Sequence, residues 1–450
     1  MTVLHSHTDV FAPDVLRVLR DDGSLDPETD PGLRDDELRV IYEAMVRTRI
    51  LDERLVTLQR QGRIGFHIGS LGEEATILGS AYALRGSDWI FPCYREFGAA
   101  LLRGMPLQSY LDNMFGNAND PAKGRQMPDH YTYKKAKFGS VSSPIGTQIT
   151  QAVGFAWGAK IKKEDLVALV YFGEGATSSN EFHNGMNFAG VFKTPVVFLC
   201  RNNGWAISVP TERQSASETF AAKGLAYGVP AVRCDGNDIF AVVAATRQAV
   251  AHAAAGKGPM LVEALTYRLS GHSTSDDPKA YRKEDEVEAW RRRDPLVRFR
   301  EYLSRRGIWD DEQQAELEKV VDAEVAAAVK QAESTPAPAL HSMFEDVFQE
   351  MPWHLREQLS QLEKLPRAKG HGAGGHLAAP RFQRHGRGNY PNAPDEHGAG
   401  HQRRPPARDE ARRSRRGARR RRRQGRRRFP RHLRFVRRVR RRSGDRHAAE

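Results

Sequence analysis

Two short loops in the middle of the chain contain residues that suit the binding of a metal ion and a phosphate group. The first is Gly173-Glu174-Gly175-Ala176 and the second is Arg201-Asn202-Asn203-Gly204. A carboxylate between two glycines lets the backbone approach a phosphate while the side chain binds a divalent cation, and an amide oxygen in the second loop adds another hard ligand. Together the two loops predict a site for Mg²⁺ and a diphosphate.

Both loops follow runs of apolar residues that predict buried parallel strands. These runs are Leu166 to Phe172 and Val196 to Cys200, and a third such run spans Met260 to Leu265. The 26 residues between Gly175 and Asn202 are about what a helix and a returning strand require. Because ligands of doubly wound sheets bind outside the carboxyl ends of the strands, we expect both loops at one ligand-binding edge.

The segments around these strands have the apolar spacing of amphipathic helices. Helical spacing begins near Leu38, and we expect further helices from Ile239 to Ala255, started by Asp238, and from Glu312 to Glu333. Strands that alternate with helices indicate an α/β fold. We therefore expect a doubly wound, mostly parallel sheet flanked by helices.

Length and charge divide the 450-residue chain into three parts. Residues 1–35 are polar and contain turn signals, so we expect an extended arm outside the core. Residues 36–365 should form the folded domain, since 39% hydrophobic residues suffice for a sizeable core. Residues 366–450 contain 28 Lys and Arg and six acidic residues, a net charge of +22, whereas the part before them carries −8. We expect this basic tail to be disordered.

Cysteine usage and hydropathy exclude several classes of protein. Cys93, Cys200 and Cys234 lie far apart without a C-x-x-C pair, so neither a zinc site nor a disulfide framework is indicated. No run approaches the roughly 20 apolar residues that span a bilayer, and residues 1–13 lack the apolar centre of a signal peptide. These features favour a cytoplasmic protein without a membrane partner.

The whole pattern, from Leu38 to about Arg356, resembles the alpha subunits of thiamine-diphosphate-dependent 2-oxoacid dehydrogenases. In that family a Gly-Asp-Gly loop is followed by a paired Asn, and branched-chain members commonly have Glu where Glu174 stands. The segments Tyr94-Arg95-Glu96 and His272-Ser273-Thr274-Ser275-Asp276-Asp277 are also closer to the branched-chain type. The alternative within the family is the alpha subunit of pyruvate dehydrogenase.

The resemblance implies ligands for three cofactors. Mg²⁺ would be bound by Glu174, Asn203 and the carbonyl of Trp205. The residues at thiamine diphosphate would be Tyr94, Arg95, Ser143, Gly173, Glu174, Gly175, Ala176, Arg201, Asn203 and His272. A monovalent cation, usually K⁺, would be held by Ser142, Pro144, Thr147 and Gln148.

The resemblance also implies a catalytic residue and a substrate pocket. His272 follows a predicted strand at the ligand edge, where a near-neutral imidazole suits proton transfer. It is our candidate catalytic residue. Phe66 and His67 would line the pocket for the 2-oxoacid.

The activity that the resemblance implies is oxidative decarboxylation of branched-chain 2-oxoacids, such as 3-methyl-2-oxobutanoate. The acyl group would be transferred reductively to the lipoyl domain of a dihydrolipoyl transacylase. The family activates its cofactor with a glutamate from a beta subunit, for which this chain has no candidate. We therefore expect an alpha2-beta2 assembly.

The basic tail has two further interpretations. Its Arg-rich run, from Arg403 to Arg442, would attract nucleic-acid phosphates nonspecifically, and it has few aromatic residues for base stacking. Its composition is also typical of GC-rich DNA translated in the wrong frame. Codons permitted from His397 onward, read one nucleotide later, can spell MVQAINDALRREMRRDE and GLFDEFGDE, which resemble the start of the beta subunit.

Overall fold

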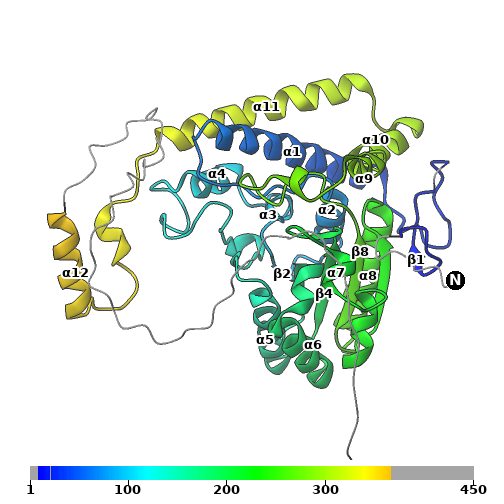
Figure 1. The fold of residues 1–450 in the computed structure, drawn as a ribbon, viewed down its shortest axis with the longest axis horizontal. Coiled ribbons are helices and arrows are strands. Elements are labelled where there is room, and N and C mark those ends of the chain that lie inside the picture. Colours follow the sequence, from blue (N-terminus) through cyan, green and yellow to red (C-terminus); the bar gives the residue numbers. More distant parts are fainter. Residues whose placement is uncertain (1–8, 21, 366–450) are drawn as a thin grey trace, which may run out of the picture. The chain divides into compact units, whose positions relative to one another are not determined.

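A six-stranded parallel sheet forms the centre of the computed structural model, which describes residues 9–20 and 22–365 (Figure 1). The strand order is β1-β7-β8-β4-β3-β2, and every neighbouring pair is parallel. The loops that leave β3, β4 and β8 are therefore neighbours at one edge of the sheet. The strands are β1 (Val15–Leu16), β2 (Trp89–Phe91), β3 (Ala168–Gly173), β4 (Val196–Asn202), β7 (Ala231–Asp235) and β8 (Met260–Leu265).

Helices cover both faces of this sheet because successive strand residues point to opposite sides. In β3, Leu169 and Tyr171 pack into the core beside α1, α2 and α8, whereas Val170 and Phe172 pack beside α5 and α6. Burial on both faces explains why the strand is apolar throughout. These helices are α1 (Asp35–Arg60), α2 (Glu74–Tyr82), α5 (Thr147–Lys162), α6 (Asn180–Phe192) and α8 (Ile239–Ala254).

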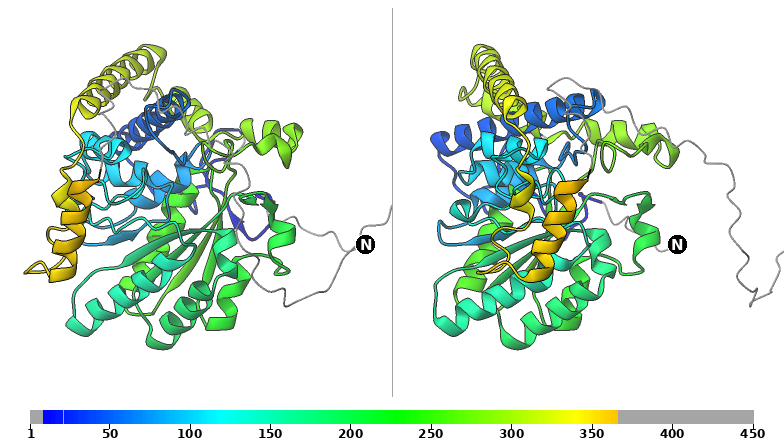
Figure 2. Two further views of the ribbon diagram at one scale, coloured as in Figure 1. Left: turned by 60° about the vertical axis from the view of Figure 1, so that its left-hand side comes forward. Right: turned by 90° about the vertical axis from the view of Figure 1, so that its left-hand side faces the viewer.

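The remaining helices lie around the central sheet and the helices that cover it. The long helix α11 packs against α1 and α4 (Figure 2). A short hairpin of β5 (Trp205–Ala206) and β6 (Val209–Pro210) follows β4. The other helices are α3 (Phe97–Leu102), α4 (Leu107–Phe115), α7 (Thr211–Gln214), α9 (Glu284–Arg291), α10 (Pro295–Arg305), α11 (Asp311–Ser334) and α12 (Trp353–Lys364).

The predicted fold class is confirmed, and the main predicted elements are present. The three apolar runs form β3, β4 and β8, with β4 extending two residues further, to Asn202. The side chain of Asp238 accepts hydrogen bonds from the amides of Phe240 and Ala241 at 3.0 and 3.2 Å, so it caps α8 as predicted.

The structure corrects the prediction for the N-terminal arm. Part of the arm belongs to the core: β1 adds a strand to the sheet beside β7, and Val10, Val18 and Leu19 are buried. The carboxylate of Asp238 accepts the amide hydrogens of Val18 and Leu19 at 2.8 and 2.7 Å. The segment is too short for a periodic signal, so this long-range attachment could not be inferred from its composition.

Several other predictions concern cysteines, membranes and the tail. Cys93, Cys200 and Cys234 are free and buried. Over the described ranges, the structure contains no helix that is long and apolar enough to cross a membrane. The basic tail, 366–450, lies outside the described residues. The predictions of disorder, nonspecific nucleic-acid binding and out-of-frame translation concern this tail and stay predictions.

Candidate active site

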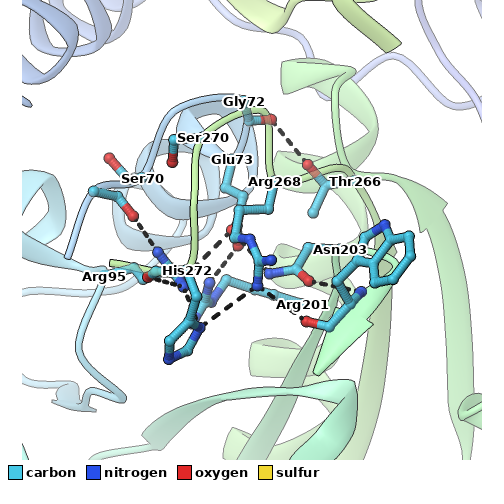
Figure 3. Close-up of polar contacts among 12 residues, drawn as sticks. Ser70, Gly72, Glu73, Arg95, Arg201, Asn203, Thr266, Arg268, Ser270 and His272 are labelled. Carbon is cyan, nitrogen blue, oxygen red and sulfur yellow. Dashed lines mark hydrogen bonds and ion pairs between the residues drawn. The ribbon is translucent and has the colours of Figure 1, made fainter. Parts of the chain in front are cut away.

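The candidate site lies where β3, β4 and β8 end. Glu174 comes directly after β3, Arg201 is the penultimate residue of β4 and Asn203 follows that strand. His272 lies in the loop after β8 (Figure 3). The sheet thus brings together residues that are about 100 positions apart in the sequence, as the strand order requires.

Three buried arginines face two buried glutamates at this site. Arg95, Arg201 and Arg268 are each at most 2% exposed, and Glu73 and Glu96 are fully buried. Arg201 forms ion pairs with both glutamates, at 2.8 Å to Glu96, and the Nε of Arg95 lies 3.8 Å from Glu73. Within the described part of the chain, no carboxylate lies within ion-pair distance of Arg268, so one of the three arginines has no ion-pair partner.

The arginines also have donors without acceptors. The Nε atoms of Arg201 and Arg268 are buried and have no hydrogen-bond partner among the described residues. A buried charged donor that lacks an acceptor costs more than a neutral one, on the order of 1–3 kcal/mol or above. An anion with several oxygens would satisfy these donors, so the arrangement fits a diphosphate.

A set of hard oxygen atoms lies beside the arginines. Glu174 is 1% exposed, and its carboxylate accepts the amide hydrogen of Asn203 at 3.2 Å. Burial raises the pKa of Glu174 to about 7. The Nδ2 of Asn203 donates to Glu73 at 2.9 Å, which orients the amide, and its Oδ1 accepts the amide hydrogen of Trp205 at 3.2 Å. A carboxylate, an amide oxygen and the nearby carbonyl of Trp205 form a donor set that suits Mg²⁺.

The glycines of the first loop have different structural roles. A Cβ atom on Gly175 would lie 2.7 Å from the Cβ of Ala206, so the close approach of these two segments requires glycine. A Cβ on Gly173 would meet nothing within 4 Å. The loop from Gly173 to Ala176 therefore packs tightly on one side and leaves backbone accessible on the other, as a phosphate-binding loop requires.

His272 is held between two guanidinium groups. Its Nδ1 lies 3.1 Å from Nη2 of Arg95 and 3.5 Å from Nη1 of Arg268, and its backbone amide donates to Asp276 at 2.6 Å. Burial, with the charges of Arg95 and Arg268, lowers the pKa of His272 to about 3. The ring is therefore neutral, with Nδ1 as acceptor and the proton on Nε2. The Tyr94 ring contacts it edge-on, with centroids 5.9 Å apart.

The predicted monovalent-cation loop has one feature that suits a cation. Gln148 is buried and donates its Nε2 hydrogen to a backbone carbonyl of β3 at 2.9 Å, while its Oε1 has no hydrogen-bond partner among the described residues. The hydroxyl of Thr147 donates to the carbonyl of Pro144 at 3.0 Å. Ser143 is exposed and hydrogen-bonds to His130, and Ser142 is partly buried. The K⁺ site stays a prediction.

The predicted substrate-pocket residues differ in their surroundings. Phe66 is half-buried. His67 is fully buried, and its two ring nitrogens lie 2.9 Å from Asp52 and 3.1 Å from Asp129. Both polar atoms of the ring are thus engaged within the protein. The role of Phe66 and His67 at the substrate stays a prediction.

Three site residues had no role in the sequence prediction: Glu73, Glu96 and Arg268. Glu73 is the N-cap of α2, an otherwise apolar helix that is buried from Glu74 to Ala81. Two adjacent glutamates, Glu73 and Glu74, at the start of such an apolar helix indicate that a carboxylate is buried there. The sequence does not show its partner, because Arg201 lies 128 positions further along the chain. Only the folded sheet shows which cation each glutamate faces.

The fold and the site define a doubly wound α/β protein with buried side chains suited to a metal ion and a diphosphate. The sequence pattern of the family described as dehydrogenase E1 component matches residues 42–341. The chain belongs to this family.

Individual relatives agree with this assignment. The mitochondrial 2-oxoisovalerate dehydrogenase alpha subunits of Mus musculus and Homo sapiens are both 44% identical to it over 352 residues, which cover 78% of this chain and 80% and 79% of the relatives. The corresponding alpha subunit of Caenorhabditis elegans is 43% identical over 341 residues, which cover 75% of this chain and 79% of that relative. The predicted resemblance to branched-chain alpha subunits is confirmed. The relatives are named as mitochondrial, so they do not support the predicted cytoplasmic location, which stays a prediction.

Proposed function

We propose that this chain is the alpha subunit of a branched-chain 2-oxoacid dehydrogenase, which decarboxylates 3-methyl-2-oxobutanoate and related 2-oxoacids oxidatively. The single observation that supports it best is the buried arginine cluster with donors lacking acceptors, next to a neutral His272. That combination suits a diphosphate cofactor beside a proton-transfer group. The pyruvate alternative is less well supported, because the relatives described above are named for 2-oxoisovalerate.

The residues present fit thiamine diphosphate with Mg²⁺. Arg95 and Arg201, with Arg268 as an addition to the predicted set, would bind the diphosphate oxygens, while Glu174 and Asn203 would hold Mg²⁺ together with the carbonyl of Trp205. Tyr94, Ser143 and the loop Gly173 to Ala176 would border the cofactor. When bound, thiamine diphosphate supplies the electron sink for loss of CO₂ from a 2-oxoacid.

The chain's own residues would orient the reactants and move a proton. Arg95 and Arg268 keep Nδ1 of His272 occupied as an acceptor, which directs the Nε2–H of the ring away from them. A neutral imidazole can donate that proton and take it back during turnover. Negative charge placed between the two guanidinium groups would raise the pKa of His272 from its low value, toward the range useful for acid–base chemistry.

The proposed assembly is alpha2-beta2, with the lipoyl domain of a dihydrolipoyl transacylase as the second substrate. Family membership supports a beta subunit and a transacylase as partners. The described site would contribute cations, metal ligands and a histidine. The sequence offers no candidate for the activating glutamate that the family resemblance implies. A beta subunit would supply it.

The test is decarboxylation by the chain purified with its matching beta subunit, thiamine diphosphate and Mg²⁺. We expect a higher kcat/KM for 3-methyl-2-oxobutanoate than for pyruvate, and reductive acylation of a lipoyl domain by the same assembly. A higher kcat/KM for pyruvate would overturn the substrate assignment, and no decarboxylation of either acid would overturn the function.

A further inference from the structure

A buried histidine outside the proposed chemistry lies between two carboxylates. The Nε2 of His67 is 2.9 Å from Oδ1 of Asp52, and its Nδ1 is 3.1 Å from Oδ2 of Asp129. All three side chains are at most 5% exposed. A ring with an ionised acceptor at each nitrogen carries a proton on both, so these residues form a buried ionic triad.

The two aspartates of the triad also fix the backbone beside His67. Asp129 accepts the amide hydrogen of Ile68 at 2.7 Å, and Asp52 accepts that of Ser70 at 2.6 Å. Gly69 lies so close that a Cβ atom on it would be 2.4 Å from the Asp52 carboxylate. Segment 67–70 is therefore held at three successive points before it leads into the site residue Glu73.

The fixed segment contacts the loop of His272 through two routes. In the first, the amide of His67 donates to the hydroxyl of Thr274 at 3.1 Å and the amide of Thr274 donates to the carbonyl of His67 at 3.0 Å. In the second, the Nη1 of Arg95 donates to the carbonyl of Gly69. The Nη2 of the same arginine lies 2.9 Å from the carbonyl oxygen of His272 and 3.1 Å from its Nδ1. Figure 3 shows Arg95 beside His272. Both attachments flank the catalytic ring.

The loop needs such attachments because it does not pack closely on the neighbouring helix. A cavity of about 630 Å³ lies between α1 and the loop, lined by Glu53 and Thr57 on one side and by Ser270, Ser273 and Lys279 on the other. On the side that faces α1, hydrogen bonds such as those of Thr274 therefore fix the loop in place of side-chain packing.

We propose that His67, with Asp52 and Asp129, is a positioning residue for His272 and sets the position of residues 271–274 through segment 67–70. A buried ion pair is weak support for stability, since apolar replacements are often neutral or stabilising, whereas its directional bonds can specify one arrangement. This proposal rests on the proposed function and gives His67 a role other than the substrate-pocket role predicted from the sequence. A displaced His272 would slow proton transfer without weakening substrate binding.

The experiment uses the alpha-beta assembly with thiamine diphosphate and Mg²⁺ and compares His67→Gln, Asp129→Asn and Thr274→Val. We expect kcat per cofactor-loaded site to fall by roughly 10-fold to 10²-fold, since small misplacements of reacting groups cost about this much. KM for 3-methyl-2-oxobutanoate should change less than about twofold, because uniform binding is retained. Trypsin cleavage after Lys279, in the same loop, should accelerate.

A double-mutant cycle separates positioning from general stability. Because His67 and Thr274 act along one route, the loss of kcat in His67→Gln/Thr274→Val should be smaller than the product of the two single losses. Tyr42→Phe is the matched control: it removes a 3.0 Å hydrogen bond to Gln314 from the same helix as Asp52, and it should leave kcat, KM and the cleavage rate unchanged.

Two results would overturn the proposal. A raised KM with unchanged kcat would assign His67 to the substrate pocket instead. Multiplicative losses in the cycle, with wild-type cleavage after Lys279, would reduce the triad to a stabilising cluster. If His67→Gln yields no soluble assembly, Asp129→Asn and Thr274→Val carry the same two readouts. An inactive wild-type assembly would contradict the proposed function, and the cleavage rates would still test the positioning of the loop.

Discussion

Two clusters of buried charge lie at the carboxyl edge of the same sheet, and they differ in how their arginines are paired. At the end of β7, Asp235 forms ion pairs with Arg293 and Arg298 at 2.8 and 3.0 Å. At the end of β4, Arg201 is paired with two glutamates, but Arg268 has no carboxylate within ion-pair distance among the described residues.

The difference separates a structural cluster from a binding site. Asp235 joins the sheet to residues at the start of and within α10, and Asp238 joins it to the N-terminal segment. The partners of both aspartates therefore belong to the scaffold of the domain. In the cluster at β4, Arg268 donates to neutral oxygens of Trp205, Ile207 and Tyr281, so an anionic ligand would stabilise it. Buried charge alone therefore does not identify a site, whereas buried charge without an internal counterpart does.

The largest expected effect is loss of the proposed metal ligands beside the cluster at β4. Glu174→Ala or Asn203→Ala should abolish Mg²⁺-dependent binding of thiamine diphosphate, because each removes a hard oxygen ligand. Isothermal calorimetry on the alpha-beta assembly measures this. Affinity equal to wild type in either variant would remove that residue from the proposed metal site.

The next largest effect is that of His272, whose removal should lower turnover without weakening cofactor binding. His272→Ala should leave the cofactor bound but lower kcat by roughly 10² to 10⁴, the usual cost of removing a general acid or base. Turnover is measured beside cofactor affinity in the same preparation. Wild-type turnover would show that His272 has no role in proton transfer.

Removal of Asp235 should affect stability and leave ligand binding intact. Asp235→Asn leaves Arg293 and Arg298 without their shared carboxylate, and breaking a buried pair in this way typically costs about 3–5 kcal/mol. We expect a lower urea midpoint but unchanged cofactor affinity at low urea. If affinity fell as much as in Glu174→Ala, the distinction between the two clusters would fail.

A smaller, pH-dependent effect should come from the triad around His67. Burial lowers the pKa of His67, but Asp129 and Asp52 outweigh it and raise that pKa from 6.5 to about 10. A raised folded-state pKa stabilises the fold fully below pH 6.5, and this stabilisation is lost as the pH rises through about 10. Urea unfolding between pH 6.5 and 10 should therefore show falling stability, and His67→Gln should flatten the slope. An equal slope in both proteins would contradict the assignment of an imidazolium.

The smallest expected effect is that of the basic tail. Truncation after Leu365 should leave melting temperature and activity of the alpha-beta assembly unchanged, because 28 positive charges against six negative ones in residues 366–450 repel one another in any compact state. Retention on a polyanion column should fall, as salt already weakens it. Lost activity would show that the tail contributes to the catalytic domain.

Much of the site could be predicted because its residues follow strands in recognisable loops. Glu174 and Asn203 lie next to glycines after apolar runs, so local pattern and strand topology were sufficient to place them together. The arm could not be predicted, since β1 is two residues long and depends on Asp238 for its attachment. The substrate-pocket role of His67 came from the family resemblance and stays a prediction, whereas its contacts with Asp52 and Asp129 could not be inferred from the order of residues along the chain.

The sequence by itself determined the α/β class, the strands of the site and the residues suited to metal and phosphate, because periodicity and glycine-flanked loops are local properties. Only the tertiary structure decided which charges are neutralised. Glu73 and Glu96 pair with Arg201, while Arg268, four residues before His272, has no carboxylate partner in the described ranges and helps to keep that ring neutral. The reason is physical: Coulomb interactions depend on distance and burial in space, and neither quantity can be read from the order of residues along the chain.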